Sequence, residues 1–233
     1  MYKKITHEIV EEHFANNTRP MQGYTNGIDT IGISEPLPSY VMTEITMLFR
    51  MDARSAWTKW AFSLMNYAVS LNGNLPGTDQ VKGRMHKNAV AIGDFLVPYY
   101  GMSAGRSFAT ALIGIDDIGM HYVEALKAKQ PTAEIVKSWT PYISDVAKLM
   151  NELNPTQWPK LLIEDILTNL VQAWQDQLTA RASGNIVDDE IAIDYIGKLI
   201  VTGVPDHIKH GYLSLADVFS RGIIAQFPSM FAE

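Results

Sequence analysis

Apolar residues recur at every third or fourth position along most of the chain, which is the period that an amphipathic α-helix produces. No stretch shows convincing alternation of apolar and polar residues, the pattern that indicates a strand. The length of 233 residues and the hydrophobic fraction of 47% suffice for a sizeable buried core. The sequence therefore predicts an all-α protein.

Turn signals divide this pattern into about eight helices. They are expected over residues 5–16, 39–71, 78–97, 103–128, 132–153, 159–181 and 188–200, and from near Pro205 into the apolar tail GIIAQFPSMF. Thr78, Ser103 and Asp188 are the expected N-caps, because a short polar side chain there accepts a hydrogen bond from a free backbone N–H. Pro98 is expected to end the helix that contains NAVAIGDF, and Pro141 to kink its own helix.

The segment between residues 16 and 38 is rich in Gly, Pro, Asn and Thr and predicts a long loop or arm. Loops of this length inside a domain are usually functional or wrap a neighbouring surface. We therefore expect an N-terminal helix plus arm over residues 1–38 and a helical bundle domain over residues 39–233. Short connections in the second part favour antiparallel neighbours, hence an up-and-down bundle with additional helices.

Four of the expected helices carry an apolar stripe that can face a common core. The stripes consist of Trp57, Trp60, Ala61, Leu64, Ala68 and Leu71; Phe108, Leu112, Ile115, Gly119, Tyr122 and Leu126; Ile163, Ile166, Leu170, Ala173 and Trp174; and Ile208, Tyr212, Ala216, Phe219 and Ile223. Two arginines, Arg50 and Arg181, fall on or near these stripes. A buried guanidinium needs a carboxylate or a ligand anion, and an internal ion pair is the favoured interpretation.

Bulk properties exclude several classes of protein. The chain has no cysteine, which excludes disulfides, thiolate metal sites and a cysteine nucleophile. The net charge of −6 argues against nucleic acid and anionic membranes as partners. The N-terminus lacks the apolar core of a signal peptide, and no apolar run is long enough to span a membrane. A soluble, cytoplasmic protein is expected.

The six histidines are the first candidates for metal ligands. In HEIVEEH, His7 and His13 lie about 240° apart around a helix, so they cannot share one ion. A half-site of His7 with Glu11, or of Glu8 with Glu12, is less favoured there than a solvated acidic helix.

Two Asp-x-x-x-His pairs, Asp117 with His121 and Asp206 with His210, place two potential ligands on one helical face. Both pairs fall away from the apolar stripes, which favours surface pairs over metal ligands. His86 and His207 look isolated. We therefore expect no metal and no other cofactor.

Other catalytic patterns are missing from the sequence. It contains no G-x-S-x-G nucleophile elbow, no phosphate-binding P-loop and no dinucleotide-binding glycine pattern. The acidic runs at residues 164–165 and 188–190 are interpreted as exposed faces or caps. Whether the chain is an enzyme stays open at this point.

Four motifs resemble those of a family of uncharacterised bacterial helical proteins that are ferritin-like in character. They are NLP at residues 74–76, IGDFLVPYYGMSAG at 92–105, NPTQWP at 154–159 and ADVFSRGIIAQFP at 216–228, and the resemblance spans residues 56–231. The family pattern implies a histidine on each of four main helices, hence a metal site inside the bundle. In this sequence those positions are occupied by Trp60, Ile115, Leu170 and Lys209, and the expected acidic position by Ala91. The resemblance thus implies a bundle whose metal ligands have been replaced by packing.

Three hypotheses follow. The first is a non-catalytic bundle used for binding or self-assembly, forming a homo-oligomer. The second is a metal-independent binder or enzyme that holds a small apolar molecule between the helices. Its pocket would be lined by Trp57, Trp60, Met65, Ile115, Leu170, Trp174 and Tyr212. The third is a residual metal enzyme that uses Asp117, His121, Asp206 and His210.

Overall fold

Helices make up nearly all of the described part of the chain, and the predicted all-α class is confirmed in these residues. The computed structural model describes residues 43–206 and 211–232, which belong to one structural unit. The predicted helix over residues 5–16, the arm and the boundary at residue 38 lie outside the described residues.

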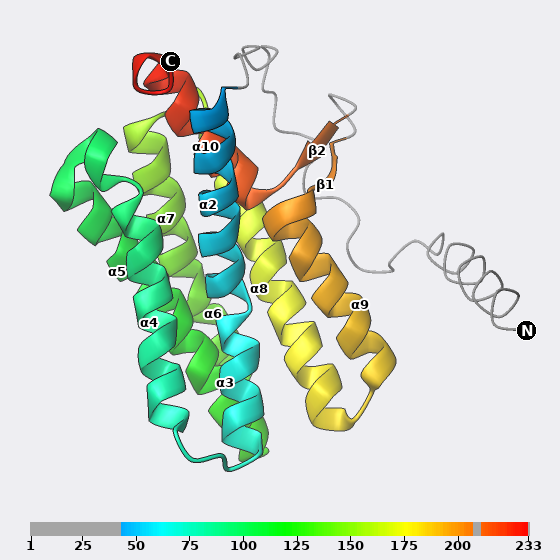
Figure 1. Ribbon diagram of the computed structural model, residues 1–233. Helices are drawn as coiled ribbons and strands as arrows, with labels where there is room; N and C mark the ends of the chain where they lie inside the picture. The colour runs from blue at the N-terminus through cyan, green and yellow to red at the C-terminus, as the bar shows by residue number, and fades with distance from the viewer. Residues whose placement is uncertain (1–42, 207–210, 233) are drawn as a thin grey trace, which may run out of the picture. The chain divides into compact units, whose positions relative to one another are not determined.

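The helices are joined by short connections (Figure 1). They are α2 (Glu44–Ala61), α3 (Ser63–Asn72), α4 (Thr78–Asp94), α5 (Val97–Lys127), α6 (Ala133–Lys137), α7 (Trp139–Leu153), α8 (Lys160–Ser183), α9 (Ile186–Gly197), the π-helical turn η1 (Lys198–Thr202), α10 (Leu215–Gln226) and the 3₁₀ turn η2 (Pro228–Met230). Two short strands, β1 (Val204–Asp206) and β2 (Gly211–Leu213), pair antiparallel between η1 and α10.

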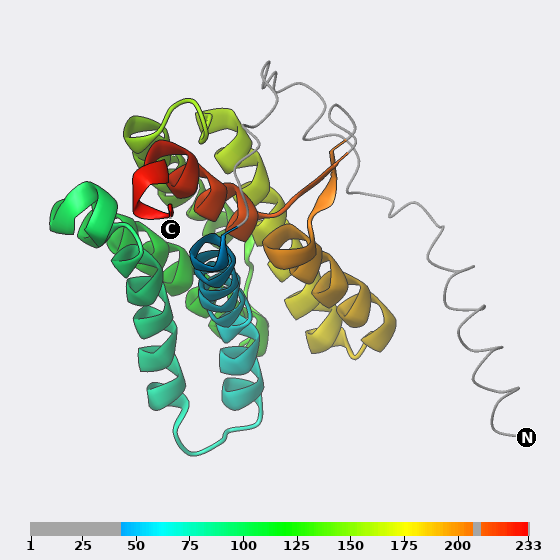
Figure 2. The same cartoon turned by 45° about the horizontal axis from the view of Figure 1, so that its top comes forward.

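The helices pack mainly on their chain neighbours. Figures 1 and 2 show α2 and α3 end to end, α4 running back beside them, and α8 and α9 as an antiparallel pair. Helix α5 packs between α4 and α7, and α10 packs on α2. None of the described helices combines the length and apolar composition that a membrane span requires.

The predicted stripes form the core. The buried members are Trp57, Trp60, Ala61, Leu64, Ala68, Phe108, Leu112, Ile115, Gly119, Tyr122, Ile163, Ile166, Leu170, Ala173, Trp174, Ala216, Phe219 and Ile223. Leu71 and Leu126, at the ends of their stripes, are half-buried. Periodicity therefore predicts the buried face of each helix, and burial of such side chains is the main stabilising contribution.

The single helix predicted over residues 39–71 is divided into two helices, α2 and α3. Thr43 caps α2, accepting a hydrogen bond from the backbone N–H of Thr46 at 3.1 Å. The helix is interrupted at Phe62, where α2 ends and α3 begins, although the apolar stripe continues through both. Residues 39–42 lie outside the described residues.

The prediction that Pro98 ends a helix and that Ser103 caps the next is wrong. Helix α4 ends earlier, at Asp94, and Pro98 lies in the first turn of α5, where a missing N–H has no consequence. Ser103 is an internal residue of α5. The kink near this point lies at Gly101, whose φ of 85° and ψ of 166° suit a residue without a Cβ.

The last helix begins later than predicted. Pro205 lies in strand β1 opposite Tyr212 in β2, so Tyr212 does not belong to a helical stripe, and Ile208 lies outside the described residues. A left-handed Gly203, with a φ of 87°, separates η1 from the strand. Helix α10 starts only after Ser214, whose hydroxyl accepts the N–H of Asp217 at 3.2 Å.

Smaller corrections concern the other caps. Gly77, with a φ of 95°, is the N-cap of α4, and Thr78 is its first residue. Asn185, rather than Asp188, caps α9. The helix expected over residues 132–153 breaks at Ser138, so Pro141 falls in the first turn of α7 and causes no kink. Pro159 is the N-cap residue of α8 and not its first helical residue.

Two glycines of α4 provide a matched test of the packing against α5. A Cβ on Gly93 would lie 2.5 Å from the carbonyl oxygen of Gly105, whereas a Cβ on Gly83 meets nothing within 4 Å. We expect Gly93→Ala to lower the free energy of unfolding by about 1–3 kcal/mol through overpacking. Gly83→Ala should raise it by about 0.5–1 kcal/mol, because alanine favours the helix. Urea denaturation of both variants checks this, and equal effects would contradict the close contact of α4 with α5.

Candidate functional site

Three tryptophans from α2 and α8 meet where the sequence predicts a pocket. The ring centroids of Trp57 and Trp60 lie 5.4 Å apart, and those of Trp60 and Trp174 lie 5.3 Å apart, both edge to face. Trp57 also contacts Phe108 of α5 and Phe219 of α10, with ring centroids at 6.2 and 5.6 Å. These are the distances of closely packed aromatic side chains. The rings thus pack against one another at the place where a ligand was considered.

The other residues considered for the pocket have different surroundings. Ile115 and Leu170 are buried in the same core, and Met65 is half-buried. The side chain of Tyr212 lies outside the described residues. Ile115 and Leu170 are thus shown to be buried. That these residues line a ligand pocket stays a prediction.

The positions that the resemblance assigns to histidines can also be placed. Trp60, Ile115 and Leu170 are buried, while Lys209 lies outside the described residues. Ala91, at the expected acidic position, is exposed on α4. Three of the five positions therefore belong to the core, and Ala91 does not.

A carboxyl group that the sequence analysis missed lies in this core. Asp116 of α5 is 2% exposed, and its Oδ2 has no hydrogen-bond partner. Burial raises the pKa of Asp116 well above its usual value, and the adjacent Asp117 carboxylate raises it further. The indole N–H of Trp60 is near enough to oppose this shift, but it makes no hydrogen bond of normal geometry. Burial in this core therefore favours the protonated, neutral form of the Asp116 carboxyl group.

The indole groups of the core differ in how their N–H groups are satisfied. Trp174 Nε1 donates to the carbonyl oxygen of Ala61 at 3.0 Å, and Trp139 Nε1 donates to that of Ile115 at 3.0 Å. In contrast, Nε1 of Trp57 and Nε1 of Trp60 are buried without a partner. Unpaired buried polar groups usually cost free energy. The two indole N–H groups and Oδ2 of Asp116 are therefore buried polar atoms of the core whose hydrogen bonding is not satisfied.

The residues considered as metal ligands do not converge in the described part of the chain. Oδ1 of Asp117 lies 2.9 Å from Nε2 of His86 in α4. The prediction that His86 is isolated is therefore wrong. His121 is exposed. Asp206 belongs to β1, but its side chain and all of His210 lie outside the described residues.

Among the described residues, no three side chains of His, Asp or Glu are arranged to hold a metal ion. The expectation of a metal-free protein stays a prediction, which elemental analysis of the purified protein tests.

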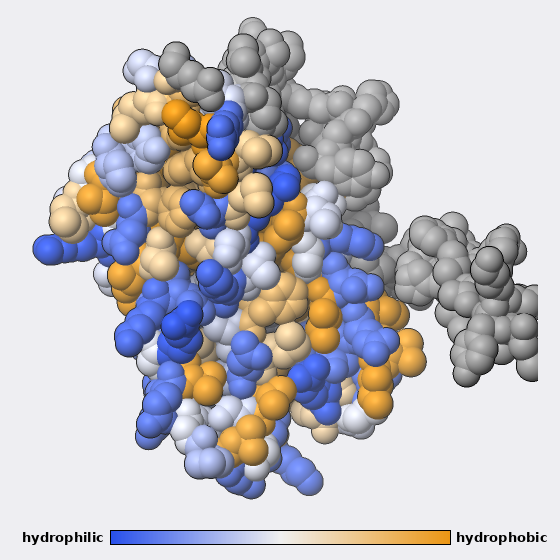
Figure 3. All heavy atoms as spheres, in the orientation of Figure 1, coloured by the Kyte–Doolittle hydropathy of each residue, from blue (hydrophilic) through white to orange (hydrophobic). Residues whose placement is uncertain are grey.

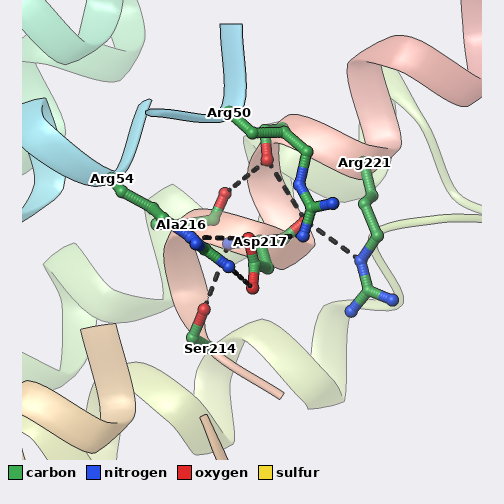
Figure 4. Close-up of polar contacts among 7 residues, drawn as sticks. Arg50, Arg54, Ser214, Ala216, Asp217 and Arg221 are labelled. Carbon is green, nitrogen blue, oxygen red and sulfur yellow. Dashed lines mark hydrogen bonds and ion pairs between the residues drawn. The ribbon is translucent and has the colours of Figure 1, made fainter. Parts of the chain in front are cut away.

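An ion-pair cluster joins α2 to α10 (Figure 4). Arg54 donates two hydrogen bonds to Asp217, from Nε to Oδ1 at 3.1 Å and from Nη2 to Oδ2 at 2.8 Å. Arg50 donates from Nη2 to the same Oδ1 at 3.1 Å. Arg221 donates from Nε to the backbone carbonyl oxygen of Asp217 at 3.4 Å. We call Arg50, Arg54, Arg221 and Asp217 the arginine cluster.

The arginine cluster confirms the ion pair predicted for Arg50. Burial alone would raise the pKa of Asp217, but the hydrogen bonds and positive charges of Arg54 and Arg50 outweigh burial and hold this pKa below its usual value. The carboxylate is therefore ionised wherever the protein is folded at moderate pH. Nε of Arg50 remains a buried donor without a partner.

The ion pair predicted for Arg181 is confirmed as well. Its guanidinium donates to Asp189 of α9, from Nη2 to Oδ2 at 2.8 Å. Gln177 donates to the other oxygen of the same carboxylate at 2.6 Å. Asp189 is buried, so the interpretation of the 188–190 run as exposed or capping is wrong for this residue. This carboxylate holds α9 against α8.

Comparison of the chain with protein-family models, with curated proteins and with solved structures gave no match. Function therefore has to be argued from the geometry of this molecule.

The sequence contains a signal for two carboxyl groups that the sequence analysis missed, those of Asp116 and Asp217. Asp116 follows Leu112 by four positions, so it falls within the buried stripe of its helix. Asp217 stands in the first turn of the last helix, where an acidic residue complements the helix dipole. Its pairing with Arg50 and Arg54 gives no local signal, because the partners are far apart in the chain.

Trp60→Ala measures how much of the core depends on the tryptophan contacts. Because Trp60 is fully buried, we expect the free energy of unfolding to fall by about 3–5 kcal/mol. Trp60→His should destabilise as well, without stabilisation by added iron, since no described ligand set surrounds it. Denaturant melts with and without iron check both, with Leu161→Ala, at a residue of α8 that is 66% exposed, as the control. A loss near 1 kcal/mol for Trp60→Ala would indicate a ligand pocket that opens to solvent.

Asp116→Asn tests the buried acid through pH. Between the usual pKa of aspartate and its raised value in the folded state, the folded protein holds a proton that the unfolded chain has lost. The stability of the wild type should therefore fall by up to about 1.4 kcal/mol per pH unit over this window. Asp116→Asn should lack this decrease of stability with rising pH, and its free energy of unfolding at pH 7.5 should exceed that of the wild type.

The measurement is urea denaturation of both proteins at pH 4.5, 6.0 and 7.5. Asp145→Asn is the control, since this carboxylate is exposed on α7 and its loss removes one acidic group without touching the core. The raised pKa of Asp116 is contradicted if Asp116→Asn and the wild type show the same dependence of stability on pH.

Proposed function

We propose that the protein is a non-catalytic helical bundle of ferritin-like type that acts by self-assembly, and that two copies meet through the outer face of α2. This outer face consists of Glu44, Leu48, Met51, Ser55 and Lys59, with Ile45 and Met47 beside it. The observation that supports the proposal most is the exposure of apolar side chains on consecutive turns of one helix.

The apolar side chains of the outer face, and of the residues beside it, are accessible to solvent. Ile45, Met47, Leu48 and Met51 are between 43% and 57% exposed. In Figure 3, apolar residues gather near the upper end of α2, on the face turned toward the viewer. Isolated exposed apolar residues are ordinary, but a contiguous group is typical of an interaction surface. Methionine is also common at such surfaces, because its flexible side chain adapts to a partner.

The arrangement of charges on the outer face favours a second copy as the partner. Glu44 stands at the N-terminal end of the face and Lys59 at the C-terminal end, and both are exposed. If two copies of α2 cross antiparallel about an axis between Met51 and Asp52, each Glu44 meets the Lys59 of the other copy. The same symmetry places Leu48 opposite the small Ser55. The face is therefore complementary to itself in charge and in size.

The alternative of a small apolar ligand inside the bundle has less support. The tryptophan rings proposed to line the pocket are fully buried and contact one another. Met65 is half-buried, and nothing in its surroundings indicates a ligand. Self-assembly therefore accounts better for the features of the described residues.

Light scattering coupled to size exclusion tests the proposal. We expect the wild type to have twice the mass of the chain at micromolar concentration. Met51→Lys places two lysines at the symmetry axis and should weaken the dimer by about 30-fold, or about 2 kcal/mol, through repulsion and lost apolar contact. Val187→Lys on α9, where the valine is 67% exposed, is the matched control and should leave the mass unchanged.

Charge reversal tests the antiparallel geometry separately. Glu44→Lys should weaken the dimer, because each protomer then presents lysine to lysine. Adding Lys59→Glu should restore the affinity, since the opposite charges face each other again. A wild type that stays monomeric would refute the proposed function, and a double variant as weak as the single one would refute the antiparallel pairing.

A further inference from the structure

The end of the described chain returns to the start of α2 (Figures 1 and 2). After α10 the chain makes the 3₁₀ turn η2, and Phe231 then lies beside the N-terminal end of α2. The hydroxyl of Thr43 donates a hydrogen bond to the carbonyl oxygen of Phe231 at 3.0 Å, although the two residues are 188 positions apart in the sequence. We call residues 228–231 the C-terminal clasp.

The hydroxyl that binds the C-terminal clasp is also the cap of α2. Oγ1 of Thr43 accepts a hydrogen bond from the backbone N–H of Thr46 at 3.1 Å. A hydroxyl has one hydrogen and two lone pairs, so donation to Phe231 leaves a lone pair for this N–H. The hydroxyl of Thr46 is 3.3 Å from Thr43 Oγ1, farther away than the carbonyl oxygen of Phe231. The clasp therefore orients the group that stabilises the first turn of α2.

The side chain of Phe231 anchors the C-terminal clasp among other aromatic rings. Phe231 is 4% exposed, and its ring centroid lies 5.1 Å from that of Phe49 in α2, edge to face. The same ring is stacked on Tyr99 of α5, with centroids 5.8 Å apart. Phe49 in turn contacts Phe95, with centroids 5.6 Å apart. One side chain of the clasp thus joins the beginnings of α2 and α5.

The C-terminal clasp can open without unfolding the bundle. Residues 228–230 are exposed, so Phe231 is the residue of the clasp that is buried. The preceding Phe227 has contacts of its own, with ring centroids 5.3 Å from Tyr99 and 5.2 Å from Tyr100. A terminal segment that is held mainly by one buried side chain opens at a lower free energy than a core helix does.

We propose that the C-terminal clasp regulates self-assembly. When the clasp is closed, it orders the first turn of α2, and when it is open, this turn frays. The turn carries Glu44, Ile45 and Met47, which belong to the N-terminal end of the outer face and the residues beside it. The inference rests on the proposed function, in which Glu44 meets Lys59 of the second copy. Proteolytic trimming at the exposed residues 228–230 removes Phe231 and therefore lowers the affinity of the dimer.

Amide hydrogen exchange tests whether the C-terminal clasp orders the first turn of α2. Phe231→Ala is compared with Phe231 in the full chain, both carrying Met51→Lys to weaken the dimer, so that protection arises within one copy. The backbone N–H groups of Thr46 and Met47 donate to Thr43. We expect them to exchange about tenfold faster in Phe231→Ala, because local opening is easier without the anchor. The amides of α8 should exchange as before.

Light scattering over a range of protein concentrations tests the effect on assembly, in chains that keep Met51. The dissociation constant of the dimer should rise about tenfold in Phe231→Ala, because copies with an ordered first turn are then a minority. Phe231→Leu keeps much of the apolar volume, and its dissociation constant should fall between the two. Met230→Ala, at a residue of the same clasp that is 50% exposed, is the matched control and should behave like the wild type.

Three results overturn the proposed regulation. The first is unchanged exchange of Thr46 and Met47 in Phe231→Ala, which would show that the clasp does not order this turn. The second is equally faster exchange in α2 and α8, which would show that Phe231 only stabilises the bundle as a whole. The third is a dimeric wild type whose dissociation constant Phe231→Ala leaves unchanged, in which case the proposed function stands. A monomeric wild type instead refutes the proposed function, and the regulation of assembly with it.

Discussion

Edge-to-face contacts between aromatic rings hold four helices of the bundle together. Trp57 of α2 contacts Phe108 of α5 and Phe219 of α10, and its neighbour Trp60 contacts Trp174 of α8. Such rings bury large apolar areas and also have preferred relative orientations. A shift of α2 would disturb contacts with all three other helices. The outer face of α2 and the two arginines Arg50 and Arg54 thus belong to a helix that these contacts hold in place.

The buried faces could be predicted from the sequence because helical periodicity is a local property. Trp60, Phe108 and Leu170 follow directly from counting 100° per residue, and all three are buried. Helix ends were less predictable, because proline occurs both where a helix stops and in its first turn. Pro98 is of the second kind. Pro205 lies in strand β1, which pairs with the nearby strand β2 instead of starting a helix.

The polar interactions were predictable only in part. A buried arginine requires a carboxylate, so the need of Arg50 and Arg181 for a partner follows from the sequence. The partner of Arg181, Asp189, lies only eight residues away along the chain, at the start of the next helix. The partner of Arg50, Asp217, comes from the last helix, and only the packing of α10 on α2 brings them together. Long-range pairs of this kind have no signature in one sequence.

The burial of every tryptophan has an optical consequence. All five tryptophans are at most 2% exposed, and Trp60 is in contact with the rings of two others. Indole emission shifts to the red when water reaches the ring, so the fluorescence of this protein reports on its interior. Neither the outer face of α2 nor the arginine cluster contains a fluorescent reporter of its own. A red shift on mixing with any partner would therefore mean that water has entered the core.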